Sequence, residues 1–206
     1  MGDDRGRVLS ELHAARIAGA DDFGRFVSNV EFSGPSSFDE RAAMPVLLRL
    51  LPTLQDPKVV SAVAGHLRRP WARPTAYEPL HDAFRSWAPR EPMGAGWAVG
   101  DALATAAAAQ HAHELLVLVE DATYGTARQM IAYSLWRYKA VADVEPVLTD
   151  LLADDDVALH AMSALQRVID QARMRPHWER LVARTPNSPL GKQAASRLRK
   201  LGPPLR

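Results

Sequence analysis

The sequence predicts an all-α fold, an α-solenoid in which about five helix pairs stack into a right-handed superhelix between capping helices. The first indication is the stretch Tyr124–Leu165. It reads as a helix, a short turn, a second helix that opens at Glu-Pro, an acidic turn, and the first helix again. Each helix pair is too small to bury its apolar face alone, so neighbouring pairs have to stack into one continuous core.

Two independent series of residues repeat with one period. Leucines are expected to close the core face of each first helix, at intervals of 30 to 36 residues: Leu67, Leu103, Leu135, Leu165 and Leu198. Three positions earlier, four of the five residues are small, as close helix packing requires: Ala64, Gly100, Ala132, Met162 and Ala195. The second helices are expected to begin at intervals of 32 to 35 residues, near Pro45, Pro79, Glu114, Pro146 and Glu179. Unrelated amphipathic helices would not keep the two series in phase, so their agreement indicates a true repeat.

Two segments carry a resemblance to a known repeat family. They are Ala127–Leu135, with the sequence ARQMIAYSL, and Val144–Leu152, with the sequence VEPVLTDLL. They are similar to HEAT-like repeats, particularly the short bacterial form that also occurs in phycobilisome lyases. The resemblance covers about Phe38–Leu201 and departs from the pattern at the long connections Leu67–Tyr77 and Trp87–Gly96. It implies an architecture of HEAT-like helix pairs and is almost silent on function, since such repeats serve scaffolds, chaperones and a few enzymes.

The chain before the repeats is expected to form two capping helices. The first should run from about Asp4 to Ala18, and Asp21 or Asp22 should cap a second that reaches Val30. Asp39 should then cap a strongly apolar helix that ends near Leu54. We therefore expect one repeat domain over 1–206, with capping helices in 1–37, repeats in 38–186, and a basic capping helix and tail in 187–206.

The amino-acid composition excludes several classes of protein. The 206 residues carry 25 Lys and Arg against 24 Asp and Glu, a net charge of +1, which argues against nucleic-acid binding over the whole surface. Cysteine is absent, so disulfides and thiolate sites are excluded. The start of the chain lacks the apolar segment of a signal peptide, and no apolar run is long enough to span a bilayer. A cytoplasmic protein with no membrane association is the expectation.

The sequence predicts neither a metal nor a cofactor. His111 and His113, beside Glu114, form the one local histidine cluster. HEAT-like deoxyhypusine hydroxylases hold a di-iron centre through His-Glu pairs on successive repeats, but the equivalent positions here are Pro79, Pro146 and Glu179. We therefore interpret the histidines as solvated residues at a helix start. No nucleophile elbow and no phosphate-binding glycine loop in a strand–turn–helix context is present.

The stretch Leu67–Trp87 is the most suggestive of a binding site. It interleaves arginines with aromatic residues, and its candidate partner-binding residues are Arg68, Arg69, Trp71, Arg73, Asp82 and Arg85. A tryptophan beside arginines is the composition of a protein interface, and two prolines stiffen the loop that carries it. Alternatively, Trp71 folds back over the helix ends, Phe84 and Trp87 belong to the core, and the first two arginines complement the negative end of the preceding helix.

Charge is also segregated towards the end of the chain. Residues 143–156 contain six acidic residues and no basic one, whereas residues 173–206 contain nine basic residues against Glu179. A basic end could bind an acidic protein or nucleic acid, or could be the polar outer face of a capping helix.

These observations favour a non-catalytic interaction or scaffold module that binds a protein or peptide on its concave face, which the second helices should line. The alternative is a nucleic-acid-binding protein. Its extreme form would be an enzyme similar to the HEAT-like alkylpurine DNA glycosylases, with Asp82 or Asp101 as the catalytic carboxylate. A third hypothesis, a lyase or chaperone for a tetrapyrrole-bearing protein, follows from the family resemblance alone.

Overall fold

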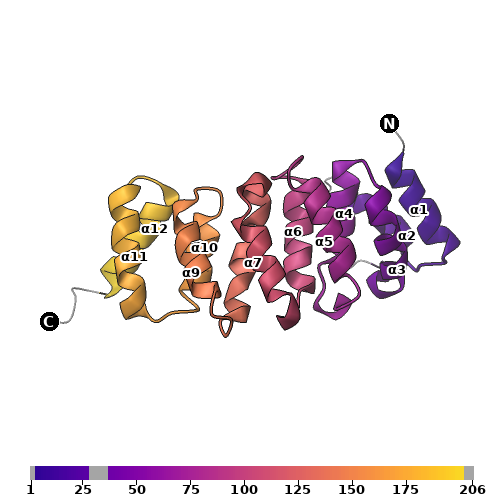
Figure 1. Cartoon of the computed structure of the whole chain (residues 1–206). Coiled ribbons are helices and arrows are strands. Elements are labelled where there is room, and N and C mark those ends of the chain that lie inside the picture. The colour runs from indigo at the N-terminus through magenta and orange to yellow at the C-terminus, as the bar shows by residue number, and fades with distance from the viewer. Residues whose placement is uncertain (1–2, 28–36, 202–206) are drawn as a thin grey trace. The chain divides into compact units, whose positions relative to one another are not determined.

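The fold is all-α, as predicted. A computed structural model describes residues 3–27 and 37–201, and every regular element in these two ranges is a helix (Figure 1). The chain divides into two compact units, Met1–Ile131 and Ala132–Arg206, which we call unit 1 and unit 2. The expectation of one continuous repeat domain stays a prediction. None of the helices within the described ranges is long and apolar enough to span a membrane.

Unit 1 consists of α-helices joined by short 3₁₀ turns. Its α-helices are α1 (Asp4–Ala14), α2 (Ala20–Val27), α3 (Glu40–Leu50), α4 (Pro57–Leu67), α5 (Tyr77–Trp87), α6 (Ala95–Ala106) and α7 (Ala112–Glu120). Its 3₁₀ segments are η1 (Leu51–Thr53), η2 (Pro70–Ala72), η3 (Ala109–His111) and η4 (Ala122–Arg128). Helix α6 packs against α4, α5 and η4, so it lies within the core of this unit.

Unit 2 follows the same plan on a smaller scale. Helix α8 (Gln129–Ser134) contains the boundary between the units, and the elements after it are η5 (Leu135–Tyr138), α9 (Val144–Asp150), η6 (Leu151–Ala153), α10 (Ala158–Leu165), α11 (Gln171–Arg184) and α12 (Pro189–Leu201). Helix α10 packs against α9, η5 and η6, and α11 packs along α12.

The first helices differ in extent from the prediction. Helix α1 ends at Ala14 rather than Ala18, because Arg16 adopts a left-handed backbone with φ of 56°. Helix α2 begins at Ala20, before both predicted caps, and Asp22 instead accepts hydrogen bonds from the backbone and hydroxyl of Ser37 at 2.9 and 2.7 Å. The predicted continuation to Val30 lies outside the described residues.

The second helices start where the repeat predicts in the middle of the chain. Pro79, Glu114 and Pro146 are each the third residue of their helices, α5, α7 and α9. The prediction is wrong at the two ends, since Pro45 lies inside α3 and Glu179 lies inside α11. In both cases an aspartate upstream caps the helix earlier than the repeat implies: Asp39 accepts from Ala42 N, as predicted, and Asp170 accepts from Arg173 N. The chain also leaves α3 at Leu50 and tightens into η1 before Leu54.

The leucine series and the small-residue series mark close packing. Leu67, Leu103, Leu135 and Leu165 are at most 1% exposed, whereas Leu198 is half-buried. A Cβ on Gly100 would lie 2.5 Å from the backbone oxygen of Ala127, so α6 approaches η4 to a distance that only glycine allows. The predicted role of small residues in this series is therefore confirmed at that position.

Candidate functional site

Three of the four arginines predicted to bind a partner are tied to the protein itself. Arg68 forms an ion pair with Asp101 at 2.5 Å, and Arg73 donates to the backbone oxygen of Thr105 at 2.6 Å. Arg69 donates from two nitrogens to the carboxylate of Glu40, at 2.5 and 2.6 Å. These contacts anchor the long connection between α4 and α5 on neighbouring helices.

The remaining predicted residues lie apart from this network. Trp71 is half-buried, and the guanidinium carbon of Arg41 lies 5.1 Å from the centroid of its ring. Asp82 and Arg85 are exposed on α5, and Asp82 lies 3.7 Å from the Nδ1 atom of His81. The structure does not gather the six predicted residues into one pocket. On the same helix, Phe84 and Trp87 belong to the core, as the alternative reading predicted.

Glu40, His66 and Arg69 form a partly buried polar cluster in unit 1. The carboxylate of Glu40 can only accept, so Nδ1 of His66, at 3.1 Å, is the donor. Burial lowers the pKa of His66, and the hydrogen bond to Glu40 opposes this effect without cancelling it. Burial alone would raise the pKa of Glu40, but hydrogen bonds from Arg69 and His66 outweigh burial and leave that pKa below its ordinary value. The folded protein therefore favours a neutral histidine beside an ionised carboxylate.

This cluster predicts that acidification destabilises the protein. The unfolded chain takes up a proton at His66 below its ordinary pKa of 6.5, whereas the folded chain resists it, so stability is full above that pH and falls below it. One proton contributes a slope of at most about 1.4 kcal/mol per pH unit. Urea unfolding between about pH 8 and pH 5 should show a shallower dependence for His66→Gln than for the natural protein. The exposed His113→Gln is the control, and equal slopes for all three proteins would contradict the interpretation.

The predicted histidine cluster is not solvated as a whole. His111 is buried, its ring stacks on Tyr77 with centroids 3.5 Å apart, and its Nδ1 accepts from the backbone of Ala108. The prediction of a solvated residue is therefore wrong for His111, while His113 is exposed. Glu114 accepts a hydrogen bond from the Tyr77 hydroxyl at 2.7 Å. Over the described ranges, no three His, Asp or Glu side chains are grouped so that they could hold a metal ion.

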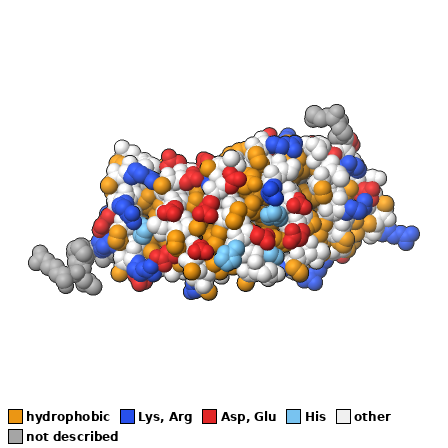
Figure 2. Space-filling model, viewed as in Figure 1, with side chains coloured by type: hydrophobic (Ala, Val, Ile, Leu, Met, Phe, Trp, Pro, Cys, Tyr) orange, Lys and Arg blue, Asp and Glu red, His pale blue; other side chains and the backbone are white. Residues whose placement is uncertain are grey.

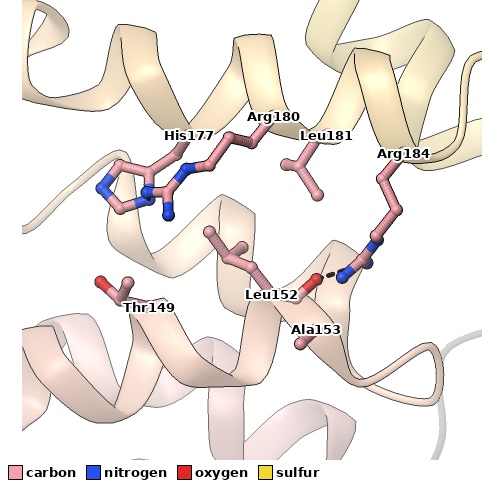
Figure 3. A pocket seen from close by; sticks show the side chains of 7 residues that line it. All are labelled: Thr149, Leu152, Ala153, His177, Arg180, Leu181 and Arg184. Atoms are coloured by element: carbon pink, nitrogen blue, oxygen red, sulfur yellow. Dashed lines mark hydrogen bonds between the residues drawn. The ribbon is translucent and has the colours of Figure 1, made fainter.

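A pocket of about 270 Å³ lies between helix α11 and the α9–η6 segment, inside unit 2 (Figure 3). We call it the α9–α11 pocket, and it is lined by Thr149, Leu152, Ala153, His177, Arg180, Leu181 and Arg184. The contributing positions follow helical spacing on both sides: i, i+3 and i+4 from Thr149, and i, i+3, i+4 and i+7 from His177. One face of each segment therefore forms each wall.

The lining separates an apolar floor from a polar rim. The buried side chains of Leu152 and Leu181 lie between the polar ones in Figure 3. Arg184 donates to the backbone oxygen of Leu152 at 2.6 Å, which joins the two walls, and lies 3.8 Å from the exposed carboxylate of Asp155. Arg180 bonds within its own helix, to Nδ1 of His177 at 3.0 Å and, weakly, to the Pro176 oxygen at 3.4 Å.

The polar side chains of this rim are donors. A guanidinium only donates, so Nδ1 of His177 accepts from Arg180, and in the neutral ring the hydrogen lies on Nε2. Burial, followed by the charge of Arg180, lowers the pKa of His177, and the opposing charge of Glu145 does not cancel this effect, which keeps the ring neutral. Arg180 has five N–H groups, of which its contacts in the described chain use two. The pocket can therefore donate several hydrogen bonds to an acceptor and neutralise negative charge.

The surface around the pocket carries charges of both signs. Figure 2 shows Lys and Arg side chains, with Asp and Glu side chains and a histidine among them, over the part of unit 2 that Figure 1 labels α11. Two arginines of α11 outside the pocket pair with carboxylates, Arg173 with Glu145 and Arg175 with Glu179. The sequence showed this basic excess in residues 173–206 but did not single out His177, Arg180 or Arg184. Their helical spacing indicates that the three side chains share one face of a helix. What the spacing could not show is that this face of α11 lies against Thr149 and Leu152.

Comparison of the chain with protein-family models, with curated proteins and with solved structures found no significant match. The resemblance to HEAT-like repeats therefore stays a prediction from the sequence.

Proposed function

We propose that this chain is a non-catalytic interaction module of the HEAT-like type, and that it binds an acidic segment of a partner protein in the α9–α11 pocket. The observation that carries the proposal is the lining of that pocket, with donors on the rim and leucines on the floor. The pocket lies between two helices that carry the second residue series, at Pro146 and Glu179. In a HEAT-like superhelix these helices line the concave face.

Contacts between residues one repeat apart support the repeat architecture. Within unit 1, Arg68 reaches Asp101 across 33 positions, and Trp97 donates to Gln129 across 32. Within unit 2, Arg184 reaches Leu152 across 32 positions. Contacts near this separation are expected in a stack of equivalent units, since each repeat touches its sequence neighbours, although other hydrogen bonds join residues 26 and 52 positions apart.

A carboxylate is the group that this rim fits. Arginine N–H groups bind carboxylates through charge-assisted hydrogen bonds, which are about twice as strong as neutral ones. The floor of Leu152 and Leu181 would pack on an aliphatic or aromatic side chain next to the acidic one. None of the described lining residues is a carboxylate, and Nδ1 of His177 is held by Arg180, so the pocket lacks the acid and base pair of an enzyme site.

The size of the pocket favours a protein segment over nucleic acid. About 270 Å³ accommodates one or two side chains, whereas nucleic-acid binding relies on many phosphate contacts along a continuous basic track. The arginines from which the sequence suggested nucleic-acid binding are already paired, Arg68 with Asp101 and Arg69 with Glu40.

Paired peptides test the proposal. We expect peptides with one Glu or Asp beside Leu, Val or Phe to bind the chain, and matched peptides with Gln or Asn to bind much more weakly. Arg180→Gln should weaken the acidic peptides by about 10- to 100-fold, because one charge-assisted hydrogen bond contributes about 1.5–3 kcal/mol. Fluorescence polarisation with labelled peptides measures both effects. The matched control is Arg199→Gln, an exposed arginine on α12 outside the pocket.

Two outcomes would overturn the proposal. One is that acidic and amide peptides bind equally, or that neither binds. The other is that DNA or RNA oligonucleotides bind more tightly than every peptide and are displaced by none, which would favour the nucleic-acid alternative.

A further inference from the structure

Unit 2 contains a second pocket, which has a different construction and does not depend on the function proposed above. It lies between α11 and α12, has a volume of about 320 Å³, and we call it the α11–α12 pocket. Its lining includes Gln166, Ile169, Met174, Trp178, Arg197 and Lys200. A volume near the lower end of the range for small-molecule sites, about 300–1,000 Å³, fits a small ligand and not a folded partner.

Two hydrogen-bond donors of the lining residues are unused. Nε1 of Trp178 and Nε2 of Gln166 are buried and have no hydrogen-bond partner among the residues that the structure describes. Trp178 as a whole is 3% exposed. Buried donors without an acceptor are rare in folded proteins because their desolvation is not compensated. Both donors belong to residues that line one pocket, and an acceptor supplied from outside the chain would compensate their desolvation.

The rim of this pocket is positive. Arg197 and Lys200 are three residues apart on α12, and neither forms an ion pair with any carboxylate in the described part of the chain. The lining also includes the apolar side chains of Ile169, which is 7% exposed, and Met174, which is 1% exposed, together with the exposed amide of Gln171. Two cations with no counter-ion next to an apolar wall are complementary to a molecule that has an anionic head and an apolar body.

We propose that the α11–α12 pocket binds a small amphiphilic anion. Arg197 and Lys200 hold its carboxylate or phosphate head, and the amide of Gln166 turns to donate to the same group. Ile169, Met174 and the indole of Trp178 cover its short apolar body. The indole N–H gains an acceptor when the ligand replaces the present packing around it. A head group of either chemistry satisfies these donors, so the probes have to distinguish carboxylate from phosphate.

Tryptophan fluorescence provides a direct test, because Trp178 forms part of the wall. Octanoate and octyl phosphate are titrated into the full chain, with octanol as the neutral match and inorganic phosphate as the head group alone. We expect saturable changes with one or both amphiphilic anions and none with octanol or inorganic phosphate over the same range. The stronger of the two anions identifies the preferred head group. In Trp178→Phe the fluorescence change should disappear, while the ligand-induced rise in melting temperature should persist.

Charge variants provide the control. Arg197→Gln should weaken binding by about tenfold or more, whereas Arg199→Gln, on the same helix but outside the pocket, should leave it unchanged. Gln166→Met should also weaken binding without lowering the stability of the unliganded chain, because it removes a donor that has no acceptor there. The proposal is overturned if octanol binds as well as octanoate, if neither anion binds, or if Arg197→Gln and Arg199→Gln behave alike.

Discussion

Replacement of Arg128 by alanine is expected to lower the free energy of unfolding by about 3–5 kcal/mol. Arg128 is 1% exposed and is among the largest side chains that the described part of unit 1 buries completely. It donates to the backbone oxygen of Val119 at 2.9 Å and to that of Gly125 at 2.9 Å. Alanine would leave a cavity and remove both hydrogen bonds at once.

The position of Arg128 explains why the loss should be large. Val119 lies in the last turn of α7, whose final carbonyl groups have no partner within the helix. Gly125 has a positive φ of 49° and turns the chain back within η4. The guanidinium therefore donates hydrogen bonds to one carbonyl group at the end of α7 and to one in the turn that follows. Its removal leaves these backbone acceptors without this donor, and a buried acceptor without a donor costs about 1–3 kcal/mol.

Chemical denaturation of three variants separates the causes. Arg128→Met retains much of the apolar bulk but no donor, so it should recover only the cavity part of the loss caused by Arg128→Ala. Arg85→Ala removes an exposed arginine from the same unit and should change stability by less than about 0.5 kcal/mol. A loss below about 1 kcal/mol for Arg128→Ala would contradict the role assigned to these hydrogen bonds.

The sequence predicted the helices best where local signals and the repeat agree. Near Pro79 and Pro146 the start of a helix is set by the same residues that mark the period, and the structure begins α5 and α9 there. Near Pro45 and Glu179 the two signals conflict. An N-cap aspartate opens the helix several residues upstream, so Pro45 and Pro176 lie inside α3 and α11, where each removes one intrahelical hydrogen bond and crowds the carbonyl group four residues earlier.

The candidate site could be predicted only in part, because a sequence displays charges but not their partners. Arg68 and Arg69 looked available for a ligand, yet their carboxylates, Asp101 and Glu40, lie 33 and 29 positions away and meet them only in the folded chain. The reverse holds for Arg180. In the sequence, Arg180 is one of nine basic residues in 173–206. Its role as a hydrogen-bond donor to a ligand depends on the apolar floor of the α9–α11 pocket, which only the folded chain forms.

Leu135→Ala tests the phase of the repeat directly and should cost about 2–5 kcal/mol. Leu135 is fully buried at the start of η5, and this segment packs against α9 and α10 within unit 2. Truncation to alanine removes three heavy atoms from a site where helices on two sides limit collapse, so most of the cavity should remain. The matched control is Leu159→Ala in α10, where the leucine is 40% exposed and the same truncation should cost less than about 1 kcal/mol. Urea denaturation compares the two variants. Equal effects would mean that the leucine at this phase does not face the core, and the period assigned to the chain would then have to be abandoned.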